Sequence, residues 1–131
     1  MKLKNILLLS VIAAITCCVM TSCEKNEWCN ITEVNTTTNW GAKIYFDGKA
    51  GNYGFLIEPG ESGINGFQEN YDKPDLNNPI DVKVEWYKNT NKEKADGKID
   101  HEFIITDYKF DYGKNYKITI REKNFSIQQV Q

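Results

Sequence analysis

Cysteine and histidine are scarce in this chain, and this excludes several kinds of site. The 131 residues contain four cysteines and a single histidine, His101. Three of the cysteines fall within the first 23 residues, so Cys29 is the only cysteine in the rest of the sequence. The domain that follows is therefore not expected to contain an intramolecular disulfide. One histidine and one cysteine also cannot build the usual zinc site, and we expect no cofactor.

An excess of positive charge is lacking as well. The sequence has 16 basic and 18 acidic residues, a formal net charge of −2. The first 22 residues hold two of the basic residues and no acidic one, so the remaining chain has 14 basic and 18 acidic residues, a net charge of −4. Nucleic acids and anionic membrane surfaces both require a basic face on the protein. Neither is expected as a partner of the domain.

Recognisable catalytic motifs are absent too. The sequence contains no nucleophile elbow and no phosphate-binding loop, and its carboxylates show no spacing typical of a glycosidase pair. Cys29 and His101 lie far apart in sequence, and a lone cysteine is more often inert than catalytic. Cys29 is thus either an early strand residue, part of a tether or a reactive thiol. We do not expect an enzyme.

The N-terminal stretch is the most informative segment that is present. Lys2 and Lys4 form a positive start, and residues 6–20 form an apolar run that is too short to span a bilayer comfortably. Small or polar residues then lead to Ser22 and Cys23. This pattern is typical of a secretory signal.

The junction at Cys23 resembles the lipobox of bacterial lipoproteins, in which a cysteine is acylated and the chain is cut just before it. Ser22 fits that pattern, whereas Met20 stands where Leu is usual; Cys17 and Cys18 lack a small residue before them. The resemblance implies a signal peptide over residues 1–22, a lipid such as palmitate on Cys23, a tether over 23–29 and a domain over 30–131. The alternative is an ordinary cleaved signal that leaves Cys23 free.

Acidic residues directly after Cys23 indicate where in the cell envelope the protein is located. Glu24 and Glu27 resemble the export signal of surface lipoproteins in Bacteroidetes, although Lys25 and Asn26 separate them. The resemblance implies a lipid-anchored protein of the outer membrane, at the cell surface or on the periplasmic face. Acyl chains would supply the contact with the membrane.

The remaining sequence has the composition and alternation of β-strands. All three Trp, seven Tyr and six Phe residues follow Cys23, and such residues are enriched in strands. Apolar and polar residues alternate over 42–46, 80–86 and 116–120. Further strands are expected at 30–35, 53–58, 64–68, 99–106 and 125–130, with turns at Asp47-Gly48 and at residues 59–63. We expect an all-β, antiparallel sandwich of seven to eight strands.

One segment sharpens this expectation. Phe110, Gly113 and Tyr116, followed by Ile118 and Ile120, resemble the corner before strand F of fibronectin type III and other immunoglobulin-like domains. Tyr112 stands where that family usually has Pro before the glycine. The resemblance implies an immunoglobulin-like sandwich in which the Tyr116 hydroxyl bonds back to the upstream backbone. Trp86 is similar to the buried tryptophan of such domains.

The loop over Asn70–Asp81 is rich in oxygen-bearing side chains. It contains Asp72, Asp75 and Asp81 as well as two asparagines. Such side chains can hold calcium in a flexible loop. Turn formation explains the same composition equally well, so both interpretations stay open.

Aromatic residues in loops and on polar strand faces give the remaining functional signal: Trp28, Trp40, Tyr45, Tyr53, Tyr71 and Tyr87. Sugars and protein partners both stack on exposed rings, unless a second sheet or a loop covers them. Trp40, Tyr53 and Tyr71 are the candidate binding residues. We expect a module that binds a glycan or an envelope protein; the alternative is a structural or assembly accessory of an envelope or fimbrial complex.

Overall fold

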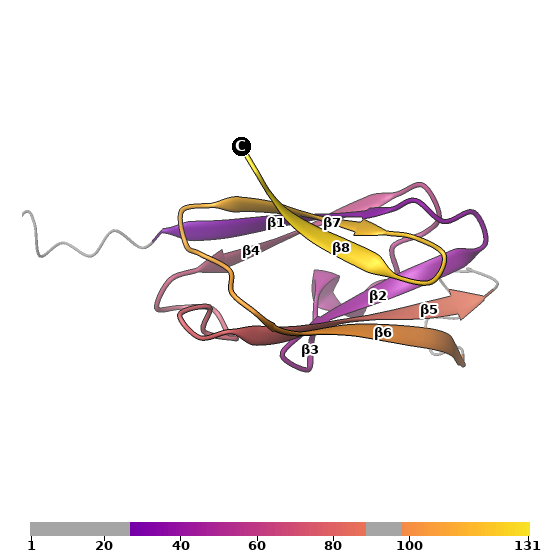
Figure 1. The fold of residues 1–131 in the computed structure, drawn as a ribbon, viewed down its shortest axis with the longest axis horizontal. Coiled ribbons are helices and arrows are strands. Elements are labelled where there is room, and N and C mark those ends of the chain that lie inside the picture. The colour runs from indigo at the N-terminus through magenta and orange to yellow at the C-terminus, as the bar shows by residue number, and fades with distance from the viewer. Residues whose placement is uncertain (1–26, 89–97) are drawn as a thin grey trace, which may run out of the picture.

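Two sheets packed face to face form the domain (Figure 1). The computed structural model describes residues 27–88 and 98–131. The expected signal peptide and Cys23 lie outside these residues, as does most of the loop between the fifth and sixth strands. Among the described residues, no helix is long and apolar enough to cross a bilayer.

Each sheet has four strands, and one pair of neighbours is parallel. The first sheet has the order β4-β1-β7-β8 and the second the order β3-β2-β5-β6. β1 pairs with β7 in parallel, and the other pairs are antiparallel. The elements are β1 (Trp28–Asn35), β2 (Trp40–Phe46), β3 (Lys49–Ala50), η1 (Asn52–Gly54), β4 (Ser62–Gln68), β5 (Ile80–Lys88), β6 (Ile99–Tyr108), β7 (Asn115–Ile120) and β8 (Phe125–Val130).

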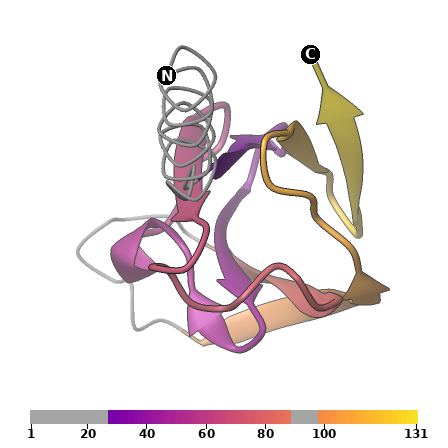
Figure 2. The same cartoon turned by 90° about the vertical axis from the view of Figure 1, so that its left-hand side faces the viewer.

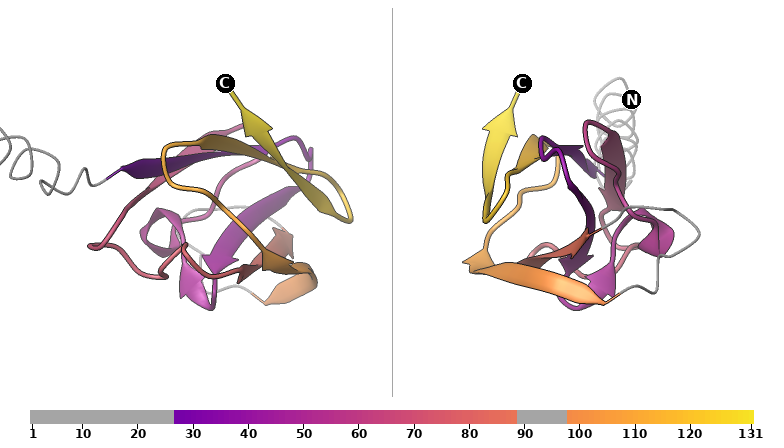
Figure 3. Two further views of the ribbon diagram at one scale, coloured as in Figure 1. Left: turned by 60° about the vertical axis from the view of Figure 1, so that its left-hand side comes forward. Right: turned by 90° about the vertical axis from the view of Figure 1, so that its right-hand side faces the viewer.

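The expectation of an all-β sandwich of seven to eight strands is confirmed. The two layers are seen from both ends in Figures 2 and 3. The strand order differs from that of immunoglobulin constant domains, however. Immunoglobulin constant domains join their first, second, fifth and fourth strands in one sheet, whereas here the first strand lies between the fourth and the seventh.

Alternation along the strands fills the space between the sheets. On β2, Ala42, Ile44 and Phe46 are buried, as the pattern predicts. On β5, the inward series ends at Trp86, which is 0% exposed. Its indole N–H donates to the Arg121 carbonyl at 2.8 Å, a residue just beyond β7, so this side chain connects the two sheets. The predicted burial of Trp86 is confirmed.

The predicted corner before β7 is present. The chain leaves β6 in one sheet and enters β7 in the other, and Tyr116 is buried at the start of β7. The Asp111 N–H donates to the Tyr116 hydroxyl at 2.8 Å. Phe110 packs edge-on against the Tyr116 ring, with centroids 4.9 Å apart. The hydroxyl therefore holds the crossover between the sheets, as the resemblance implied.

Replacing Tyr116 by Phe is expected to lower the free energy of unfolding by about 1–3 kcal/mol, because the Asp111 N–H loses its acceptor. Urea unfolding of the two proteins measures the difference. Tyr53→Phe is the control, since the Tyr53 side chain is exposed and its hydroxyl can bond to water. Equal urea midpoints for wild type and Tyr116→Phe would rule out a stabilising corner bond.

Several boundaries differ from expectation, and β4 begins at Ser62, inside the turn expected over residues 59–63. The expected strand over 53–58 is wrong: three successive residues, Asn52, Tyr53 and Gly54, have φ of 49°, 55° and 80° and form the turn η1. A left-handed run cannot continue an extended strand, and only Ile57 bridges to Ala42. β1 begins at Trp28, two residues before the expected start of the domain. Cys29 is thus a strand residue on the core face.

Candidate binding surface

The three candidate aromatics do not form one patch. Tyr53 is 97% exposed on η1, and Tyr71 is 69% exposed in the loop that follows β4. Trp40 is half-buried at the start of β2 and packs against the core. It contacts His101 edge-on, with ring centroids 5.7 Å apart. Tyr53 and Tyr71 are therefore available for contact, whereas Trp40 is largely committed to packing.

Apolar side chains gather around Tyr53. Phe55 is 70% exposed and Ile64, on the edge strand β4, is 68% exposed. Tyr53 borders a hollow of about 280 Å³ together with Phe55. Tyr53 and Ile64 border a second hollow, of about 250 Å³, that Asp72 and Lys73 also line. We call the surface formed by Tyr53, Phe55 and Ile64 the Tyr53 surface.

Polar side chains fix the turn that presents Tyr53. The Asn52 N–H donates to the Asn65 side-chain oxygen at 2.8 Å. The Asn65 amide nitrogen in turn donates to Glu33 of β1, and the Asn52 amide nitrogen lies 3.4 Å from the same carboxyl group. A side chain at Gly63 would collide with the Asn52 amide, so glycine leaves the space for this contact. The turn is thus connected to both β4 and β1.

Glu33 is the buried acid of this network. It is 0% exposed on the core face of β1. Burial raises the pKa of its carboxyl group to about 7, although the hydrogen bonds from Asn65 and Asn52 act in the opposite direction. Glu33 was not among the residues expected to be functional. It lies with Ile31 and Asn35 on one face of the strand, and this alternation could have predicted its burial.

Hydrogen bonds from backbone N–H groups to aspartate side chains hold the loop that contains Tyr71. The Gln68 N–H donates to Asp72 at 2.6 Å, the Asn77 N–H to Asp75 at 3.0 Å and the Asp107 N–H to Asp81 at 3.1 Å. Within residues 27–88 and 98–131, no three acidic, His or Cys side chains lie close enough to hold a metal. The contacts of Asp72 and Asp75 are those of turns, whereas Asp81 at the start of β5 accepts from β6.

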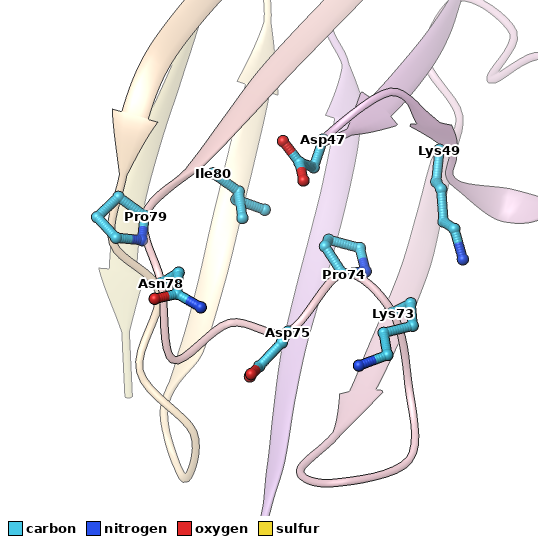
Figure 4. A pocket seen from close by; sticks show the side chains of 8 residues that line it. All are labelled: Asp47, Lys49, Lys73, Pro74, Asp75, Asn78, Pro79 and Ile80. Atoms are coloured by element: carbon cyan, nitrogen blue, oxygen red, sulfur yellow. The ribbon is translucent and has the colours of Figure 1, made fainter.

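A hollow of mixed charge lies between this loop and the β2–β3 turn (Figure 4). Asp47 contributes from the turn, and Lys73 and Asp75 from the loop, and the volume is about 390 Å³. The predicted turn at Asp47-Gly48 is confirmed, with φ of 50° and 81°. Both signs of charge line the hollow, so it favours neither an anion nor a cation.

Tyr45 and Tyr87, which were expected on a polar strand face, take part in a hydrogen-bonded cluster on the outer face of β2 and β5. The Tyr87 hydroxyl donates to Glu85 at 2.8 Å, and Lys83 lies 3.1 Å from the same carboxylate. Burial raises the pKa of Glu85, but hydrogen bonds from Tyr45, Tyr87 and Lys83 outweigh it and hold the pKa below its usual value. Lys83 also lies over the Tyr45 ring. This cluster covers the sheet face and leaves Tyr87 buried.

Cys29 and His101 have separate environments. Burial, followed by the charge of Asp111, raises the pKa of the Cys29 thiol to about 12, so the thiol stays protonated at neutral pH. His101 stacks on Trp86, with ring centroids 4.7 Å apart. Its two ring nitrogens lie 2.7 Å from the Asp100 carboxylate and from the Glu122 carbonyl. Both side chains are thus occupied in packing or local hydrogen bonds.

Comparison with known proteins assigns neither a family nor a function to this chain. The sequence matches no protein-family model, and none of the curated proteins that it was compared with is significantly similar. The fold and surface define a class only: an all-β sandwich with an exposed apolar turn beside one sheet edge.

Proposed function

We propose that this protein is a lipid-anchored binding module of the cell envelope that contacts a protein partner through the Tyr53 surface. The observation that carries the proposal is the 97% exposure of Tyr53 on a turn whose backbone is hydrogen-bonded to Asn65. A tyrosine held on an ordered turn loses little rotamer freedom when it is buried by a partner. Such anchors dominate the energetics of protein interfaces.

The shape of the surface favours a protein over a glycan. Tyr53 and Phe55 are exposed in and just after η1, and Tyr53 borders two hollows. With Ile64 they expose three large apolar side chains, and polar side chains such as Asn52, Asp72 and Glu61 line the hollows beside them. Protein interfaces combine an apolar centre with a polar rim, whereas a sugar stacks on the flat face of a single ring. Exposed apolar clusters on a soluble domain commonly mark an interaction site.

Replacing Tyr53 by Ala is expected to weaken partner binding at least tenfold, about 1.4 kcal/mol or more. The measurement is photo-crosslinking from position 55 in the full chain within its native envelope, followed by affinity measurement with the partner identified. Ile104→Ala is the matched control, because Ile104 is an exposed apolar residue on β6, away from the Tyr53 surface. Equal losses from both substitutions, or none from Tyr53→Ala, would contradict the proposal. Retention on a glycan array that depends on Tyr53 would reassign the ligand to a sugar.

The proposed anchor is tested separately. Cys23 is expected to incorporate radioactive palmitate in cells, because Ser22-Cys23 follows a positive and then an apolar segment. Cys23→Ala should abolish labelling and release the protein from membranes, whereas Cys29→Ala should retain it. Labelling that persists in Cys23→Ala would show that the site is wrong.

A further inference from the structure

Glu33 is a buried carboxyl group without a cationic partner among the described residues. Its side chain lies between the sheets, and none of the ion pairs formed by the described residues involves it. The neighbours on the same face of β1, Ile31 and Asn35, are uncharged. A charge placed in such a site is costly unless solvent or a counter-charge reaches it.

The side chains that hydrogen-bond to the carboxyl group from neighbouring described elements are both amides. Asn52 contributes from η1 and Asn65 from β4. The orientation of the Asn65 amide follows from its hydrogen bonds: its oxygen accepts from the Asn52 N–H, so its nitrogen is the group that faces Glu33. Two charged side chains, Asp72 and Lys73, line the outer hollow that Asn52 and Asn65 also line. The carboxyl group therefore lies one layer of side chains below a surface depression.

The cover over this site is a turn of left-handed residues with little packing of its own. η1 consists of three residues with positive φ, and Tyr53 is a residue type that seldom adopts this conformation. Tyr53 and Phe55 are mostly exposed and contribute little packing. Two backbone bonds close the turn, from the Gly54 N–H to the Gly51 carbonyl at 2.9 Å and from the Phe55 N–H to the Asn52 carbonyl at 3.0 Å. The amide contacts with Asn65 and Glu33, and the bond from the Gly51 N–H to the Ile44 carbonyl at 2.7 Å, attach it to the sheets.

We propose that ionisation of Glu33 opens the turn over Asn52–Gly54, so that the Tyr53 surface is assembled when this carboxyl group is neutral and is rearranged when it is charged. Opening lets water solvate the carboxylate. The structure that is lost is a strained turn that makes few packing contacts. The movement itself follows from the burial of Glu33; only its effect on partner binding rests on the proposed function.

The transition is expected near neutral pH. Burial raises the pKa of Glu33 to about 7, against the ordinary value of 4.5. No charged group contributes to this shift; the opposing contributions come from the hydrogen bonds of Asn65 and Asn52 and of the Glu33 backbone. The turn is therefore closed, and the Tyr53 surface assembled, in mildly acidic conditions. The turn opens as the pH rises through about 7.

Nuclear magnetic resonance of the isotopically labelled full chain in detergent micelles tests the inference. A pH titration follows the Glu33 side-chain carbon and the backbone amides of residues 51–55. We expect both to change with one shared midpoint near pH 7, and we expect Glu33→Gln to hold the amides in their low-pH positions throughout. Glu61→Gln is the matched control, because Glu61 lines the hollow next to Tyr53 and its loss should leave the transition unchanged.

Two results would overturn the proposal. In the first, Glu33 titrates while the amides of residues 51–55 stay fixed. In the second, the amides move equally in wild type and Glu33→Gln. Neither result depends on a partner, so a failure here is distinct from a failure of Tyr53→Ala to weaken binding. If the partner is confirmed, its affinity for wild type should fall above neutral pH and its affinity for Glu33→Gln should not.

Discussion

Replacing Glu33 by Gln is expected to raise the free energy of unfolding by about 3 kcal/mol at about pH 8 and to change it little at about pH 4. In the unfolded chain the carboxyl group ionises with a pKa of 4.5, whereas burial raises the pKa to about 7 in the folded state. Between these values the folded state binds more protons than the unfolded state. The neutral carboxyl group of the wild type therefore contributes full stability below about pH 4.5, and this stability is lost as the pH rises through about 7.

The measurement is urea unfolding of both proteins across this range of pH. Other acids titrate in both proteins alike, so the difference between the two curves isolates Glu33. The difference should grow between about pH 4.5 and pH 7 and remain constant above. Glu61→Gln serves again as the control. A difference that is independent of pH would mean that the pKa of Glu33 is the same in the folded and unfolded states, so that burial does not raise it.

Replacing Trp86 by Ala is expected to lower the free energy of unfolding by about 3–5 kcal/mol, the range for large aromatic residues in a core. Trp86 is fully buried, its ring stacks on His101, and its N–H satisfies the Arg121 carbonyl of the opposite sheet. The substitution leaves a cavity and also removes a bond between the layers.

Urea or thermal unfolding measures this loss, with Trp86→Phe as an intermediate variant. Phe retains most of the packing but cannot donate to the Arg121 carbonyl, so its cost should be about 1–3 kcal/mol. Tyr53→Ala is the control with little expected effect, because that side chain is 97% exposed. If Trp86→Ala unfolded at the same urea concentration as wild type, Trp86 would not be a core residue.

The features that could be predicted from the sequence are those set by local pattern. Alternation on β2 and β5 identified Ala42, Ile44, Phe46 and Trp86 as core residues, because a strand places every second side chain on one face. The corner was expected from the resemblance that Phe110, Gly113 and Tyr116 carry, and its contacts lie within a few residues of one another.

The features that could not be predicted depend on which strands become neighbours. Glu33 is buried because β1 lies inside a sheet with β4 on one side and β7 on the other, and sequence pattern does not report strand order. Tyr87 has the alternation of an outward residue, yet its hydroxyl bonds to Glu85 and the ring is covered. At Tyr53, an apolar run that was typical of a strand is interrupted by the left-handed turn over Asn52–Gly54.

The parallel pairing of β1 with β7 has a consequence for how the chain folds. Asn30 lies beside Asn115 in this pair. The sheet that contains β1, the first strand to be synthesised, therefore cannot be completed until β7, the last strand but one, has been synthesised. Pairings between such distant segments slow folding, because a long loop must close before its contacts form. Meanwhile β2, β5 and β6 can associate through nearer neighbours. We therefore expect the second sheet to form early, and the first to close only once the C-terminal hairpin is available.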